Sequence, residues 1–291
     1  MAEYKAFIAN CLIHGEIPSE VDNGRVWNVI KLYLDGFDLQ LVEHPEHVIQ
    51  LFDQFDGHTL HTTDLIIPEL KPDDFDRAQN LSRDVAWLLS FATVSEVSYF
   101  GYVYPEVDTP AYQQSITGRI HVGAPVIETR SGQAIRIFLE QTWPKYRALR
   151  VRRQLDIVFD YFVLSQLSRQ TIELQLLITF VLLENLKSTF AHEQGFPFED
   201  GRFKSRPGGK ALPFRELLRQ MFKAVGMTPD LSKIVQLRND IVHSGITQLA
   251  VDKRVEIYLS TQDIVREYLL RLLDYQGDYF LYAQRVVFQP A

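Results

Sequence analysis

The chain has 291 residues, of which 46% are hydrophobic and 23% charged, a composition typical of a globular protein that buries its own core. Its single cysteine, Cys11, excludes an internal disulfide, and its first residues lack the basic start and long apolar run of a secretory signal. The most apolar stretch, residues 174–183, is too short to span a bilayer, so we expect a cytoplasmic protein with no membrane partner.

The net charge of −7 is unevenly divided along the chain. Residues 1–140 contain 21 acidic and 9 basic residues, whereas residues 141–291 contain 16 and 21. An acidic half joined to a basic half predicts two domains with different partners, and only the second half suits a polyanion.

The first half of the chain has the alternation of strands. Residues 25–34 are rich in β-branched and aromatic residues, and apolar residues alternate over 37–42 after the Asp35-Gly36 turn, which predicts a β-hairpin. Apolar residues recur at helical spacing over 81–92, and residues 97–138 return to short strands. We therefore expect an α+β domain, mainly strand, over residues 1–138.

Residues 139–291 follow a helical pattern instead. The expected helices are 145–167, 171–194, 213–225, 231–244 and 261–275. Short connections, apart from one loop rich in glycine and proline, predict an all-α up-and-down helical bundle. The second of these helices is apolar on every side, which indicates the buried central helix.

The helix over 231–244 contains an arginine in an unusual place. Arg238 follows Ile234 by one turn and falls in the middle of the apolar face, which also includes Val242. A guanidinium there must be paired inside the bundle or buried against another subunit.

Two carboxylates interrupt the central helix and are the expected partners of Arg238. These are Glu173 and Glu184, either of which suits a charge-assisted pair with a guanidinium. The alternatives are that Glu173 only complements the helix dipole and that Glu184 closes a structural ion pair.

The polar edge of the same helix presents Asn239 and His243 one turn apart, with Asp240 beside them. Gly245 fits the left-handed residue that ends a helix. His243 is therefore expected in the last turn, where the helix dipole favours its protonated form.

Arg238, the polar Asn239 and, after four intervening residues, His243 together resemble the motif of the HEPN domain, specifically its ApeA-like branch. The resemblance covers residues 145–285. It implies a homodimeric endoribonuclease with a composite active site that needs no metal and no cofactor. On one helix Arg238 and His243 point about 140° apart, so a partner chain has to complete the site.

The resemblance also implies the chemistry and the role of each site residue. The RNA 2′-OH attacks the neighbouring phosphate and leaves a 2′,3′-cyclic phosphate. His243 is the general acid or base, Arg238 stabilises phosphoryl charge, and Asn239 binds the phosphate or orients the ring. Glu184, Glu173 and Asp240 support them.

Basic residues in the loop after the central helix, and in the helix that follows, are candidates for RNA binding. They are Lys204, Arg206, Lys210 and Arg219, with only Glu216 opposing the run. Such a run can follow a phosphate backbone; the alternative is a solvated face.

The same resemblance implies an effector of abortive antiviral defence, in which the N-terminal domain senses a phage or cellular trigger. Two alternatives stay open. One is a non-catalytic HEPN module that binds RNA, nucleotide or protein and uses Arg238 structurally. In the other, the N-terminal domain is the functional centre and the bundle serves dimerisation.

A metal site is not expected. The pairs His44-x-x-His47 and His58-x-x-His61, with Glu46 and Asp53 nearby, contain metal-ligating residue types. They lie in strand or loop sequence, where no helix aligns the two histidines of a pair.

Overall fold

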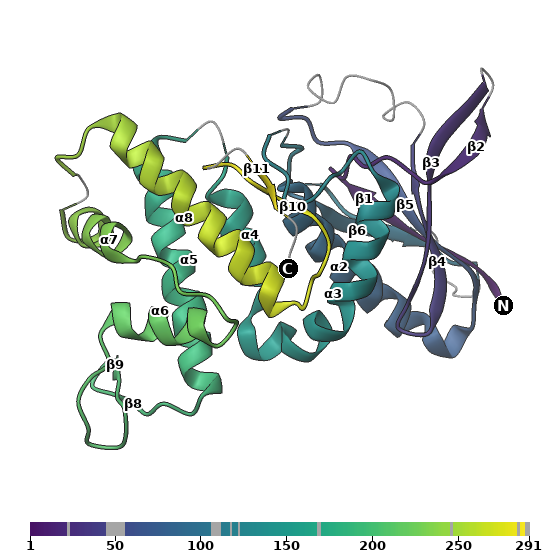
Figure 1. The fold of residues 1–291 in the computed structure, drawn as a ribbon. Coiled ribbons are helices and arrows are strands. Elements are labelled where there is room, and N and C mark those ends of the chain that lie inside the picture. Colours follow the sequence, from purple (N-terminus) through teal and green to yellow (C-terminus); the bar gives the residue numbers. More distant parts are fainter. Residues whose placement is uncertain are drawn as a thin grey trace. The chain divides into compact units, whose positions relative to one another are not determined.

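The computed structural model describes residues 1–21, 24–44, 56–105, 112–116, 118–121, 123–167, 170–244, 247–283 and 286–288. Its contacts divide the chain into two compact units. The sheet unit comprises Met1–Trp143, Gln276–Phe280 and Val286–Ala291, and the bundle unit comprises Pro144–Tyr275 and Leu281–Arg285. A strand domain followed by a helical domain is therefore the observed architecture, as expected (Figure 1).

The sheet unit contains a seven-stranded antiparallel sheet in the order β2-β3-β4-β5-β1-β6-β7. Its strands are β1 (Ala2–Ala9), β2 (Ile17–Val21), β3 (Gly24–Leu34), β4 (Phe37–Glu43), β5 (His61–Leu70), β6 (Ser98–Val103) and β7 (Tyr112–Gln113). The predicted hairpin is confirmed: β3 and β4 join through Asp35 and Gly36, both at positive φ, as a tight Asp-Gly turn requires.

One face of this sheet packs on α2 (Phe75–Thr93), which follows a short 3-10 turn, η2 (Pro72–Asp74). Tyr4 of β1 contacts Ser82 of α2 through its hydroxyl at 3.3 Å. Because side chains alternate along a strand, Lys5 and Phe7 of β1 lie on the face of the sheet opposite Tyr4 and α2. The helix expected over 81–92 is thus confirmed, with an earlier start.

The expectation of strands up to residue 138 is wrong at its end, because α3 (Gly132–Arg153) begins at Gly132. Ser131 accepts a hydrogen bond from the backbone N–H of Ala134 at 3.3 Å. The Ser131-Gly132 pair, interpreted as a turn signal, is therefore a helix cap. The contact division falls between Trp143 and Pro144, inside α3, rather than at residue 138.

The bundle unit contains the rest of α3 and five further helices among the described residues. These are α4 (Leu155–Leu164), α5 (Ile172–Glu193), α6 (Phe214–Lys223), α7 (Ser232–Ser244) and α8 (Val251–Leu272). The helix predicted over 145–167 is broken at Gln154, whose φ is 51°. The last helix begins at Val251 rather than at residue 261. The prediction missed this start because no side chain caps the helix there.

The second half of the chain is not purely helical. A small hairpin of β8 (Phe198–Glu199) and β9 (Arg202–Phe203) follows α5. A second pair of short strands, β10 (Tyr279–Leu281) and β11 (Val286–Phe288), follows α8. The expectation of an all-α second half needs this correction.

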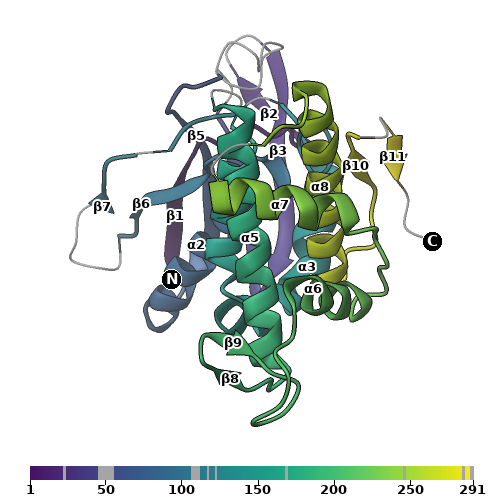
Figure 2. The same cartoon turned by 90° about the vertical axis from the view of Figure 1, so that its left-hand side faces the viewer.

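Helix α5 is the centre of the bundle unit, as predicted. It contacts α4, α6, α7 and α8, and Figure 2 shows α7 lying across it. Within the described part of the chain, α5 is the one helix long and apolar enough to cross a membrane by length and composition alone. Half of its apolar window is buried by the bundle, as for the core helix of a folded domain.

Candidate functional site

The site is built around Arg238 of α7, which pairs with Glu184 of α5. Arg238 Nη2 lies 2.7 Å from Glu184 Oε1, so the expected partner is the observed one. The arginine side chain is 21% exposed and the glutamate 33%. The guanidinium is thus neither a free surface group nor sealed inside the bundle.

A lysine that the sequence analysis did not single out completes the charge around Glu184. Lys187, one turn further along α5, forms an ion pair with Glu184 Oε2. One carboxylate therefore holds two cations, one on each oxygen, and the cluster has a net positive charge. The signal for Lys187 was its i,i+3 spacing from Glu184.

Both cations lie over the same aromatic ring. The guanidinium carbon of Arg238 is 5.0 Å from the centroid of Phe214 at the start of α6, and Lys187 Nζ is 5.4 Å from it. These distances suit cation–π contacts. We call Arg238, Lys187, Glu184 and Phe214 the Arg238 cluster; α5, α6 and α7 each contribute to it.

The guanidinium keeps unused hydrogen-bonding capacity. Arg238 Nη1 donates to the side-chain oxygen of the exposed Asn239 at 3.1 Å, a neighbour that can turn to solvent. The buried Nε of Arg238 has no hydrogen-bond partner among the described residues. An anion that replaces Asn239 at Nη1 would therefore meet a donor already positioned by Glu184.

The other predicted site residues are less closely grouped. Glu173 pairs with Arg254 of α8, so it is not a partner of Arg238. Asp240 is half-buried on α7. His243 belongs to the last turn of α7, but its side chain and Gly245 lie outside what the structure describes.

Val242 corrects one detail of the predicted apolar face. Its side chain is 43% exposed, whereas Ile234, Leu237 and Ile241 are buried. The face that α7 presents to the bundle is therefore narrower than the periodicity suggested.

The candidate RNA-binding residues fall into two groups. Lys204 pairs with Glu199 and Asp200 at 2.8 and 3.1 Å, because the β8–β9 hairpin folds these acids back toward it. Arg219 pairs with Glu216 at 2.8 Å. The other two candidates, Arg206 and Lys210, are exposed and have no ion pair within the described residues. The run was thus wrongly interpreted as nearly unopposed.

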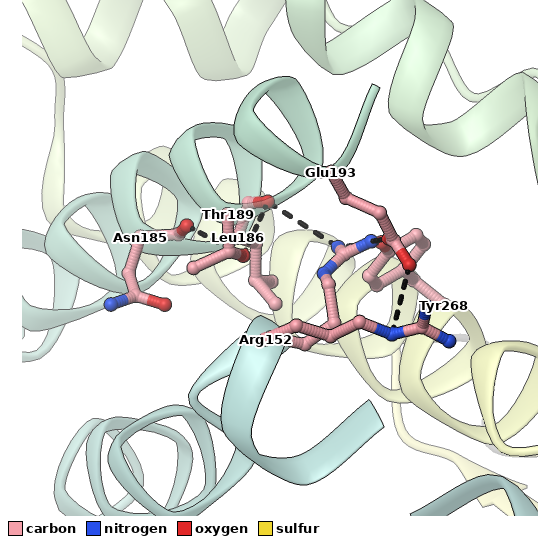
Figure 3. Close-up of polar contacts among 7 residues, drawn as sticks. Arg152, Asn185, Leu186, Thr189, Glu193 and Tyr268 are labelled. Carbon is pink, nitrogen blue, oxygen red and sulfur yellow. Dashed lines mark hydrogen bonds and ion pairs between the residues drawn. The ribbon is translucent and has the colours of Figure 1, made fainter. Parts of the chain in front are cut away.

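A second arginine pair in the bundle unit, centred on Arg153 at the end of α3, was missed by sequence reasoning. Arg153 is 2% exposed, donates to Glu193 at 2.9 Å and donates to the Tyr268 hydroxyl at 2.6 Å. Figure 3 shows Glu193 of α5 and Tyr268 of α8 at this network, with Arg152 bonded to Glu193. The signal that could have found it is helical spacing, because Arg153 follows the buried Tyr146 and Leu149 by seven and four residues, whereas Arg152 lies 100° away from it around the helix.

A cavity of about 400 Å³ adjoins this second network. Its cationic lining residues are Lys145, Arg152, Arg153 and Arg271. Each of them already pairs with a carboxylate of the chain, namely Asp274, Glu193 or Glu267. Arg152 and Arg153 share Glu193, so four cations face three carboxylates, and this lining has the same excess of one positive charge as the Arg238 cluster. The difference between the two places is that Arg153 is 2% exposed and Arg238 is 21% exposed.

The structure describes three of the four histidines weighed as a metal site. His47, with Glu46 and Asp53, lies outside the described residues, and His58 is exposed. One histidine from each pair, His44 and His61, lies beside Asp64.

In comparisons with known proteins, no family model, no curated protein and no solved structure matches the chain.

Proposed function

We propose that the bundle unit is a metal-independent endoribonuclease of the HEPN class, ApeA-like in its motif, with Arg238 as the phosphate-binding group. The observation that carries the proposal is the Arg238 cluster. It contains two cations against one carboxylate, and its arginine is held in place yet 21% exposed. A preorganised guanidinium with unused donors suits recognition of a phosphate.

The reaction proposed is transesterification within the RNA strand. The 2′-OH loses its proton to a base and attacks the adjacent phosphorus, the bond to the 5′-oxygen breaks, and that oxygen takes a proton from an acid. His243 supplies the base or the acid. Arg238 and Lys187 stabilise the charge that develops on the phosphoryl oxygens. A requirement for the 2′-OH excludes DNA as a substrate.

A homodimer completes the site in this proposal. Arg238 and His243 point about 140° apart on one helix and do not converge. The histidine that acts beside Arg238 is therefore His243 of a partner chain. Exposed apolar side chains support such an interface. Leu174, Leu177 and Val181 of α5 are 43%, 39% and 42% exposed at spacings of three and four residues, and Val242 of α7 is 43% exposed.

The sheet unit is proposed to sense a phage or cellular trigger in the cytoplasm and to release the activity of the bundle unit in abortive defence. The support is the resemblance of the motif together with the acidic balance of residues 1–140, which suits a partner other than RNA.

A second candidate function is a non-catalytic HEPN module that binds RNA, nucleotide or protein. The contacts of Arg238 with Glu184 and Phe214 favour this alternative, because they link α5, α6 and α7. In that case Arg238 is structural, and its removal unfolds the bundle unit without a specific effect on chemistry.

The test is cleavage of a single-stranded RNA by the full chain with EDTA present. We expect the wild type to leave 2′,3′-cyclic phosphate ends, His243→Ala to lose activity, and His192→Ala, a matched histidine of α5, to retain it. Replacement of the 2′-OH at the cut position should abolish cleavage. Equal activity of wild type and His243→Ala would overturn the assignment.

A further inference from the structure

Three metal-ligating side chains, His44, His61 and Asp64, meet in the sheet unit. His61 Nε2 lies 2.8 Å from Asp64 Oδ1, and His44 Nε2 lies 3.4 Å from Asp64 Oδ2. One ligand atom from each of the three residues lies within 4.8 Å of the others. His44 and His61 belong to different His-x-x-His pairs, so the spacing within one pair does not predict this group.

Strand register brings His44 to Asp64, and a shift in the β1–β5 register between Thr63 and His61 interrupts the alternation next to His61. Asp64 of β5 pairs with Val42 of β4 on one side and with Phe7 of β1 on the other. His44 follows Val42 by two residues, and its backbone N–H donates to Thr62 at 2.8 Å. Residues two apart on a strand share a face, so His44 and Asp64 lie on the face opposite α2.

The three side chains have apolar neighbours, and Asp64 is buried among them. The rings of Phe7 and Phe100 each lie 5.1 Å from the His61 ring between centroids, and Asp64 is 9% exposed. Burial acts to raise the pKa of Asp64, but hydrogen bonds with His44 and His61 hold it below its ordinary value. The carboxylate is thus ionised inside a partly apolar pocket.

We propose that His44, His61 and Asp64 form a binding site for a divalent transition-metal ion. Imidazole nitrogen and carboxylate oxygen are the donors that Zn²⁺ and Fe²⁺ take in proteins. With metal–ligand bonds of about 2.1 Å, donor atoms around one ion are about 3.0–3.5 Å apart. The separations of 2.8 and 3.4 Å already approach that range.

Two consequences follow from the number and charge of the ligands. Three protein ligands leave a position for water or an exogenous ligand, as in open rather than structural sites. Lys5 Nζ lies 3.6 Å from Asp64 Oδ2 and is 36% exposed. A bound cation repels this ammonium, so metal binding turns Lys5 toward solvent and Lys5→Met binds the ion more tightly than the wild type.

The experiment uses the full chain without an affinity tag, stripped with a chelator and titrated with Zn²⁺ in a calorimeter. We expect one ion per chain. Asp64→Asn, which keeps the size of the side chain, and His61→Ala should each weaken binding at least tenfold. His58→Ala, a matched histidine outside the group, should bind as the wild type does. No binding by the wild type, or equal binding by Asp64→Asn, would overturn the site.

A second measurement covers variants that fail to fold. Co²⁺ bound by the wild type should show visible d–d absorption from nitrogen and oxygen ligands, and stoichiometric Zn²⁺ should remove it. Absence of that band overturns the site whatever the variants do. Since both readouts report metal binding alone, their outcome is independent of RNA cleavage by the bundle unit.

Discussion

Two of the arginines that pair with a glutamate of α5, Arg153 and Arg238, have very different surroundings. Arg153 is 2% exposed, and both of its terminal nitrogens donate to groups of the chain, Glu193 and Tyr268. Arg238 is 21% exposed, and only the bond to Glu184 holds it firmly, since its other terminal nitrogen bonds the exposed Asn239. The Arg153 pair is therefore a buried structural contact. The Arg238 pair instead holds a guanidinium that solvent can reach.

The energetics of the two pairs differ in the same sense. Breaking a buried pair leaves an uncompensated charge and costs about 3–5 kcal/mol. A pair that water reaches contributes about 0–1 kcal/mol, because solvent screens it and takes over its hydrogen bonds. Stability should depend on Arg153, whereas any binding of an anion should depend on Arg238.

The largest expected effect is on stability at Arg153. Arg153→Ala should lower the free energy of unfolding of the bundle unit by about 3–5 kcal/mol, because Glu193 and Tyr268 lose a buried partner. Arg152→Ala is the matched control, since Arg152 shares Glu193 but is 57% exposed; it should cost about 1 kcal/mol or less. Denaturant titration measures both. Similar losses in the two variants would remove the distinction between buried and open pairs.

The next effect concerns the second cation at Glu184. Lys187→Met should slow RNA cleavage about tenfold, less than the roughly 100-fold that loss of a direct transition-state donor costs. Lys223→Met, on an exposed position of α6, serves as the control and should leave the single-turnover rate unchanged. A Lys187→Met enzyme as fast as the wild type would mean that the net charge of the Arg238 cluster plays no part.

The comparison between cations with and without a carboxylate partner extends to Lys204 and Arg206, in the loop after α5. Arg206→Ala should weaken binding of single-stranded RNA and reduce the slope of log affinity against log salt by about 0.7, the value for one lost phosphate contact. Lys204→Ala should change both less, because Glu199 and Asp200 already neutralise Lys204. Fluorescence anisotropy over a salt series gives the two slopes. An equal loss at both positions would contradict this division.

The smallest effect is a pH dependence at the buried network. Burial raises the pKa of Tyr268 above its ordinary value of 10.0, against the opposing effect of Arg153. As pH rises past about 10, the unfolded chain loses this proton before the folded chain does, so unfolding is favoured. Tyr268→Phe should therefore gain stability relative to wild type between about pH 9 and pH 11. A pH-independent difference would show that Tyr268 titrates normally.

Local signals in the sequence accounted for part of this architecture. The Asp35-Gly36 turn predicted the β3–β4 hairpin, and the position of Arg238 on an apolar stripe predicted a carboxylate partner on the central helix, Glu184. The break at Gln154 was not predictable, because a left-handed residue other than glycine has no sequence marker there. Ser131 was predicted to lie in a turn but caps a helix, because helix caps and turns use the same residue types.

Two further features were not predicted, for different reasons. His44 and His61 meet beside Asp64 through the β4–β5 register and a shift in the β1–β5 register, which spacing along the chain does not encode. Arg152 and Arg153 are neighbours in sequence, yet helix rotation leaves one 57% exposed and the other 2%. Helical spacing from the buried Tyr146 and Leu149 encodes this difference, so Arg153 was predictable by the same reasoning that singled out Arg238.

The most direct test of Arg238 as an open, positioned cation combines two readouts on one variant, Arg238→Met. We expect single-turnover RNA cleavage to fall about 100-fold, while the free energy of unfolding falls by about 1 kcal/mol or less. Unchanged cleavage, or a stability loss as large as that of Arg153→Ala, would contradict this role and make Arg238 a structural residue like Arg153.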